Sequence, residues 1–255
     1  MTAAPRIVCL SAEAADWFWR IGGWENVVGT TAYFTLPPDA SPKPRVSGFS
    51  SANLEQIEKL MPDLVVTFSD VQSDLAKQLI HRGLAVLATN QRTLVEIEAT
   101  LTLLARVVDR EQAAIPWLQQ FREQLAPVTP QGSRPRIYFE EWDEPHITGI
   151  AWVSELIERA GGDDIFHDLR SRHAASERIV TPAQIHAADP EIIIASWCGK
   201  PVQAAAIAAR TGWQNIAACR AGNLHEIPSE DILQPGYRII HGFERLKGII
   251  RASRL

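Results

Sequence analysis

Residues 53–66 read Asn53-Leu-Glu-Gln-Ile-Glu-Lys-Leu-Met-Pro-Asp-Leu-Val-Val66, and half a chain later residues 181–194 read Thr181-Pro-Ala-Gln-Ile-His-Ala-Ala-Asp-Pro-Glu-Ile-Ile-Ile194. In both copies a residue that favours helix N-termini opens the segment, and a proline ends the short helix that follows. An acidic residue and an unbroken aliphatic run come next, which is typical of a strand buried on both faces. The repeat therefore predicts two similar halves.

Two weaker matches support the duplication. Arg6-Ile-Val8 corresponds to Arg136-Ile-Tyr138, and the glycine pair at 22–23 corresponds to the pair at 161–162, each pair stopping a helix. Helical and aliphatic segments alternate, so the sequence predicts an α/β protein with two Rossmann-like, parallel-sheet lobes. The predicted strands are 6–10, 27–31, 63–68, 85–89, 136–140, 164–166, 191–196 and 223–227.

The two lobes are joined by a segment with helical spacing of apolar residues. Thr93-Leu-Val-Glu96 has the pattern of a capping box, and one long helix over 93–126 is predicted, with Pro116 as a possible kink or break. The predicted division is 1–92 for the N-terminal lobe, 93–126 for the connecting helix and 127–255 for the C-terminal lobe. A last helix is predicted to start near Pro235.

Composition excludes several classes of protein. The 255 residues are 46% hydrophobic and 22% charged with a net charge of −5, and they contain no basic block, so nucleic-acid and anionic-membrane partners are not expected. No run approaches the roughly 18 apolar residues of a membrane span. Only four apolar residues follow Arg6, so no signal peptide is predicted and the expected location is cytoplasmic. A mature form whose leader had been replaced by Met would look the same and would be periplasmic.

Ligands of parallel sheets bind beyond the carboxyl ends of the strands. Large aromatic and polar side chains gather at those positions, which favours a large, partly apolar ligand. Each group also has a purely structural interpretation. The tryptophans could cover the hydrophobic core, the phenylalanines could fold back onto the sheet, and the acidic run 140–144 could be a solvated loop. A structural or surface role is a simpler interpretation than metal binding for three further residues, Cys198, His146 and His225. The candidate residues at strand ends are Tyr33, Phe68, Glu141, Trp142, Trp197 and Asp231, and Phe49 lies in the loop that leads to Asn53.

Motifs of common enzymes are absent: the sequence has no GxSxG, P-loop, GxGxxG or HExxH. Three cysteines without CxxC spacing indicate neither a zinc site nor a disulfide framework. No catalytic residue, metal or intrinsic cofactor is predicted.

Val46-Ser-Gly-Phe-Ser-Ser-Ala-Asn-Leu-Glu55, followed by Pro62-Asp-Leu-Val-Val66, resembles a segment of the cobalamin-binding members of the class III substrate-binding proteins of ABC importers. Gly161-Gly-Asp-Asp-Ile-Phe166 is similar to their second-lobe segment. The resemblance covers nearly the whole chain and implies a corrinoid held between two lobes. In those members an aromatic at the position of Phe49 faces the corrin, and Phe68 matches an aromatic that follows the next strand. Together with Trp142 and Trp197, these rings are expected to supply apolar and stacking contact. Tyr33, Glu141, Asp231 and Tyr237 are expected to meet the amide periphery.

The resemblance also implies docking to a membrane permease through one surface acid on each lobe. Glu55 matches the first acid, but the repeat puts Ala183 at the position of the second. Glu177 is close enough in sequence to compensate. Together with the missing leader, the missing acid favours a corrinoid-binding protein that is no longer devoted to import.

Two alternatives remain open. The same fold could hold haem, which would favour an exposed His or Tyr, or a ferric siderophore, which would favour clustered Arg, and the predicted strand ends are poor in Arg. An enzyme acting on a tetrapyrrole or a metal would instead use the acidic run 140–144 and His146.

Overall fold

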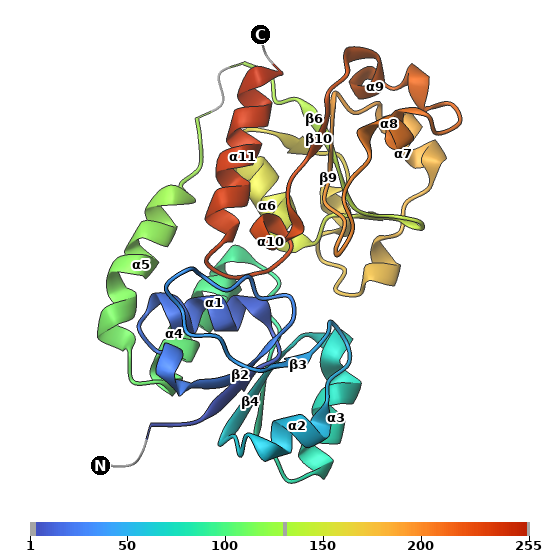
Figure 1. Cartoon of the computed structure of the whole chain (residues 1–255). Coiled ribbons are helices and arrows are strands. Elements are labelled where there is room, and N and C mark those ends of the chain that lie inside the picture. The colour runs from blue at the N-terminus through green and yellow to red at the C-terminus, as the bar shows by residue number, and fades with distance from the viewer. Residues whose placement is uncertain (1–3, 130–131, 254–255) are drawn as a thin grey trace. The chain divides into compact units, whose positions relative to one another are not determined.

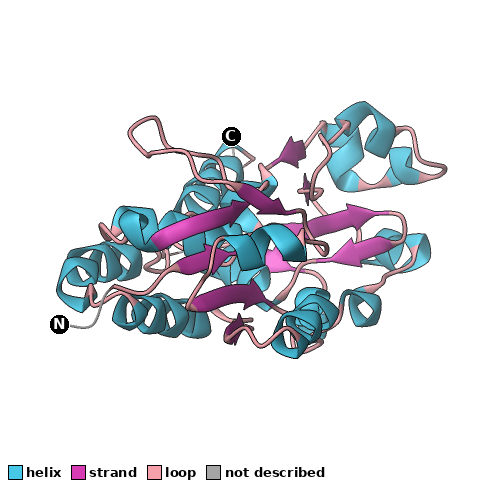
Figure 2. Ribbon diagram, turned by 60° about the horizontal axis from the view of Figure 1, so that its bottom comes forward, coloured by secondary structure: helices cyan, strands magenta, loops and turns pink. Residues whose placement is uncertain are grey.

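The computed structural model describes residues 4–129 and 132–253. The chain divides into two compact units, residues 1–91 with 95–121 and residues 92–94 with 122–255. In each unit helices flank a sheet, as Figures 1 and 2 show, which confirms the predicted α/β class. Most of the segment predicted as a connection groups with the first unit. No helix in the described part of the chain is long and apolar enough to cross a bilayer.

The first unit is built on a five-stranded sheet in the order β3-β2-β1-β4-β5, with every neighbouring pair parallel. Four of these strands were predicted. The fifth, β3, has three residues between Pro44 and Gly48, which is too short to show a period in the sequence. The strands are β1 (Ile7–Cys9), β2 (Val27–Thr31), β3 (Arg45–Ser47), β4 (Leu64–Phe68) and β5 (Val86–Thr89), and the helices are α1 (Ala12–Arg20), α2 (Leu54–Lys59) and α3 (Ser73–His81).

The second unit corrects the prediction of a wholly parallel sheet. β6 (Arg136–Asp143) pairs in parallel with β8 (Asp163–Asp164) and β9 (Ile192–Ala195), but antiparallel with β7 (His146–Thr148). The acidic run 140–144 is thus the end of a strand and its turn rather than a solvated loop. The remaining elements are β10 (Leu224–Glu226), parallel to β9, and α6 (Ala151–Arg159), α7 (Pro182–Ala188), α8 (Ala204–Ala208), α9 (Ala217–Ala221), α10 (Ser229–Ile232) and α11 (Ile239–Ala252).

The single long helix predicted over 93–126 is wrong. Two helices occupy the segment, α4 (Leu94–Val107) and α5 (Glu111–Gln124), and Figure 1 shows them as separate rods. The break falls at Asp109, whose φ of 52° lies in the left-handed region, and the N–H of Arg110 donates to the Ala105 carbonyl at 2.9 Å. This bond closes the end of α4 as a glycine cap would. Pro116 lies inside α5 without ending it.

The duplication read from the sequence is confirmed in the geometry of the helix starts. Asn53 accepts a hydrogen bond from the N–H of Gln56 at 3.0 Å, and Thr181 accepts one from the N–H of Gln184 at 3.3 Å. Each cap therefore satisfies a helix donor that would otherwise be unpaired.

The helix ends are duplicated as well. The Arg6 guanidinium donates to the Leu60 carbonyl at 2.7 Å, and the Arg136 guanidinium donates to the Asp189 carbonyl at 2.8 Å. Met61 and Asp189, each just before a proline, have φ of 45° and 41°. An arginine at the start of the first strand of each half therefore stabilises the end of the repeated helix. Both units thus present the carboxyl ends of equivalent strands along one edge of their sheet.

Candidate ligand-binding site

Two predicted site residues lie together at the carboxyl edge of the first sheet. Tyr33 follows β2 and Phe49 follows β3, and their ring centroids are 6.0 Å apart in an edge-to-face arrangement. Their side chains are 44% and 52% exposed. Aromatic rings usually bury themselves, so a pair of exposed rings held beside each other offers an apolar surface to a ligand.

A buried glutamine that the sequence analysis missed fixes this edge. Gln72 accepts a hydrogen bond from the N–H of Phe68 at 3.0 Å and donates to the carbonyls of Leu10 and Phe49 at 3.0 and 2.8 Å. It thereby ties the end of β1, the end of β4 and the Phe49 loop to one another. Phe68 itself is half-buried at the end of β4. The sequence feature that could have pointed to Gln72 is its place three residues after Ser69, just past the predicted strand end.

Glu13, in the first turn of α1, is a buried carboxyl at the same edge. Burial raises its pKa to about 7, against the opposing effect of hydrogen bonds from its own backbone and from Ser11. The side chain is 7% exposed. With this pKa the carboxyl is partly protonated near neutral pH, whereas an exposed glutamate would be ionised.

In the second unit the acidic end of β6 is neutralised by cations from three different loops. Glu140, Glu141 and Asp143 pair with Arg210, Arg178 and Lys200 respectively, each at a shortest distance of 2.6 Å. These carboxylates are therefore committed to ion pairs. The described residues hold no group of three His, Cys, Asp or Glu placed to bind a metal ion.

Glu140 is the most enclosed of the three acids, with no exposed surface. It accepts hydrogen bonds from Tyr138, Trp197 and both terminal nitrogens of Arg210, and the Nδ1 of His146 lies 3.3 Å from its Oε2. Burial on its own raises the pKa of Glu140, but the hydrogen bonds from His146 and Arg210 outweigh it and hold the pKa below its usual value. This network gives the end of β6 a fixed form.

The two predicted tryptophans differ in exposure. Trp197 is 6% exposed, packs in the core and donates its indole N–H to Glu140 at 3.2 Å. Trp142 is half-buried and donates to the Glu144 carbonyl at 2.9 Å. Lys200 lies against both rings, so the two rings predicted to contact a ligand have a cation beside them.

Two of the three remaining predicted residues of the second unit, Asp231 and Tyr237, are buried. Asp231 is 4% exposed and pairs with Arg238 at 2.8 Å and Arg245 at 3.4 Å, and Tyr237 is 1% exposed. Glu141 is held by the buried Arg178, whose guanidinium also donates to the Thr148 carbonyl. Contact of these three residues with a ligand stays a prediction. The burial of Asp231 and Tyr237 argues against it, whereas the Glu141 side chain is 21% exposed. Cys198 is exposed, and partial burial together with the Glu141 charge raises the pKa of its thiol.

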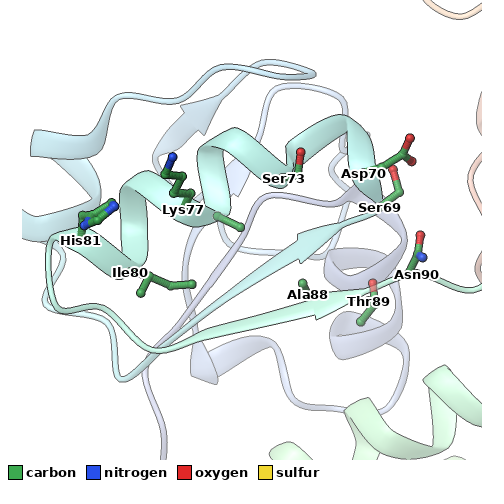
Figure 3. Close-up of a pocket in the computed structure, with 10 residues that line it drawn as sticks. Ser69, Asp70, Ser73, Lys77, Ile80, His81, Ala88, Thr89 and Asn90 are labelled. Carbon is green, nitrogen blue, oxygen red and sulfur yellow. The ribbon is translucent and has the colours of Figure 1, made fainter. Parts of the chain in front are cut away.

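A hollow of about 450 Å³ opens between α3 and the edge strand β5 in the first unit, and Figure 3 shows the side chains that line it. Ser69, Asp70 and Asn90 stand at its end nearest the carboxyl edge, while Ile80 and His81 close the other end. None of the predicted ligand residues lines it. The hollow therefore lies beside α3 and β5 and does not contain the Tyr33–Phe49 pair.

The two positions predicted for permease docking are equivalent in the structure. Glu55 and Ala183 are both the second residue of a capped helix, and both are exposed. Glu177 is also exposed, and its carboxylate accepts a hydrogen bond from the N–H of Ala174 at 3.1 Å. Its carboxylate therefore already has a local partner.

Comparison with known proteins gives three consistent matches. A model of the family described as "Periplasmic binding protein" matches residues 7–230. A cobalamin-binding protein of Halobacterium salinarum is 26% identical over 253 residues, covering 94% of this chain and 68% of that protein. The crystal structure of the periplasmic vitamin B12-binding protein of Vibrio cholerae superposes with a TM-score of 0.73 at 24% identity, covering 98% of each chain.

A periplasmic haem-binding protein of Pseudomonas aeruginosa has the same fold. Its TM-score is 0.77 at 18% identity, covering 98% of this chain and 94% of that one. At 24% and 18% identity these solved structures establish the fold of this chain but not its ligand.

Proposed function

Because this chain belongs to the periplasmic binding protein family, we propose that it binds cobalamin or a related corrinoid, one molecule per chain, and does not turn it over. The observation that carries the proposal is the exposed Tyr33–Phe49 pair at the carboxyl edge of the first sheet. The name of the Halobacterium salinarum relative supports the choice of ligand.

The physical fit lies in the size and chemistry of the corrin ring. It is a large, flat, partly apolar group with a rim of amides, and two rings held in place can contact it with little loss of side-chain freedom. Gln72 supplies that rigidity, since its hydrogen bonds fix the Phe49 loop to two strands. We expect strand-end residues of both units to contribute, as the family resemblance implies, with Trp142 as the half-buried ring of the second unit.

Haem is the second candidate, and one observation favours it. Tyr33 presents a half-exposed phenol, and a tyrosine can serve as the axial ligand of haem iron. A ferric siderophore fits less well. The structure does bring Arg178, Arg210 and Arg238 to the strand ends, which the sequence did not predict, but each is paired with a carboxylate. The same pairing leaves the acidic run 140–144 poorly suited to general acid–base or metal chemistry.

Titration with cyanocobalamin and, separately, haemin distinguishes the two candidates. The proposal predicts a stoichiometric complex with cobalamin that quenches tryptophan fluorescence, and weaker binding of haemin. If haemin binds more tightly and Tyr33→Phe shifts its Soret band, haem is the ligand and the corrinoid proposal fails.

The missing acid at Ala183 supports a holding role rather than import. Charge pairs at a desolvated interface can each contribute more than about 1.4 kcal/mol, so one missing pair should weaken docking at least tenfold. We expect little stimulation of ATP hydrolysis by a reconstituted cobalamin importer, and partial recovery with Ala183→Glu. Glu55→Ala is the matched change on the other unit and should remove what stimulation is left. Strong stimulation by the unmodified chain that Glu177→Ala abolishes would show that Glu177 replaces the missing acid.

A further inference from the structure

Lys200 lies where the second unit was predicted to stack on a ligand. Its Nζ is 4.2 Å from the ring centroid of Trp142 and 5.0 Å from that of Trp197, both within range of a cation–π contact. Its Nζ also lies 2.6 Å from Oδ1 of Asp143. The ammonium is therefore held in one place by two rings and a carboxylate.

The charge of Asp143 keeps this arrangement in place near neutral pH. Partial burial on its own raises the pKa of Asp143, but the hydrogen bond and charge of Lys200 outweigh it, so the pKa lies below its usual range. The carboxylate stays ionised and keeps Lys200 beside the indole rings.

Of the three cations at the end of β6, Lys200 has the greatest capacity for a further partner. The Arg178 side chain is 2% exposed and the Arg210 side chain 19%, and each makes a two-pronged pair with its glutamate. The Lys200 side chain is 39% exposed. An ammonium has three donors, and Asp143 takes one of them. With a side chain 39% exposed, the ammonium has donors left for a further acceptor.

A flat ligand that stacks on Trp142 from the side of Lys200 must therefore either displace this ammonium or satisfy it. Resting on the proposed function, we propose that Lys200 recognises an oxyanion that the bound tetrapyrrole carries beside its ring. In a complete corrinoid that oxyanion is the phosphodiester of the nucleotide loop, and in haem it is a propionate. Both are strong acceptors for an ammonium held in fixed position.

The test compares each ligand with a form that lacks the oxyanion. Cyanocobalamin is paired with dicyanocobinamide, which has the corrin ring but no phosphate, and haemin is paired with its dimethyl ester. Calorimetric titrations give the dissociation constant of each ligand for Lys200→Met and for the unmodified chain. The ratio of the two constants is the effect of Lys200 on that ligand. We expect Lys200→Met to weaken binding of cobalamin about tenfold and to change binding of cobinamide less than twofold. A tenfold effect on haemin and none on its ester would identify the propionate as the oxyanion.

Lys247→Met is the matched control, because Lys247 lies 5.0 Å from the Phe243 ring and 2.6 Å from Glu244 in the same unit, away from the strand ends. It should change none of the dissociation constants. An equal loss for cobalamin and cobinamide would overturn the proposal, since Lys200 would then only support Trp142. Tighter binding of both by Lys200→Met would also overturn it, because Lys200 would then obstruct the rings. If the unmodified chain binds neither tetrapyrrole, the proposed function itself fails.

Discussion

Replacing Arg210 with leucine should lower the free energy of unfolding by about 3–5 kcal/mol, because it leaves the carboxylate of Glu140 buried without its main partner. Glu140 has no exposed surface, and Arg210 supplies two of its hydrogen bonds at 2.6 and 2.9 Å. Urea denaturation at pH 7 measures the loss. The stabilisation is present above the unfolded pKa of about 4.5 and disappears as pH falls through the lower folded pKa, so the two proteins should converge in acid.

Arg170→Leu is the matched control. Arg170 also pairs with Glu158, with one guanidinium nitrogen donating to both carboxylate oxygens at 3.0 and 3.1 Å, but both side chains are more than a third exposed. An exposed pair of this kind contributes about 0–1 kcal/mol. A double variant with methionine at 140 and 210 should recover most of the stability lost in Arg210→Leu, since no charge is then left buried. Equal losses for the two arginine variants would contradict the buried network.

Changing both Tyr33 and Phe49 to alanine should weaken corrinoid binding by about 1–3 kcal/mol per ring, which is the range for truncating an aromatic anchor. The two side chains are about half exposed, so the free energy of unfolding should change little. Calorimetric titration of cyanocobalamin into the double variant gives the loss, and a denaturation curve confirms that the fold is intact.

Met61→Ala is the control for the removal of exposed apolar surface. Met61 is 73% exposed and precedes β4, so it lies at the amino end of the strand, away from the candidate site. Its replacement should leave corrinoid affinity unchanged. If Met61→Ala weakens binding as much as the double variant does, the aromatic pair is not the binding surface.

The repeat allowed the fold to be predicted because its cues are local. A capping residue, a proline and an aliphatic run each act within a few residues of the chain, and the caps at Asn53 and Thr181 form as their types require. The break at Asp109 was missed because neither glycine nor proline marks it. Pro116, which was the obvious breaker, lies within α5.

The candidate site was less predictable because its geometry depends on pairs far apart in sequence. The acidic run at the end of β6 reads as a solvated loop unless one knows that residues 178, 200 and 210 bring cations to it. Trp197 packs in the core and Lys200 lies against Trp142, which spacing along the chain cannot show. Tyr33 could be predicted because it lies just past the end of a predicted strand, and strand ends share one edge of a parallel sheet. Phe49 follows β3, which was not predicted, so it was found through the family resemblance of residues 46–55 instead.

The most direct test of the corrinoid proposal is a calorimetric titration of the unmodified chain with cyanocobalamin, followed in parallel by tryptophan fluorescence. We expect saturation at one cobalamin per chain, with quenching that follows the same curve. Absence of heat and of quenching at high micromolar cobalamin would contradict it.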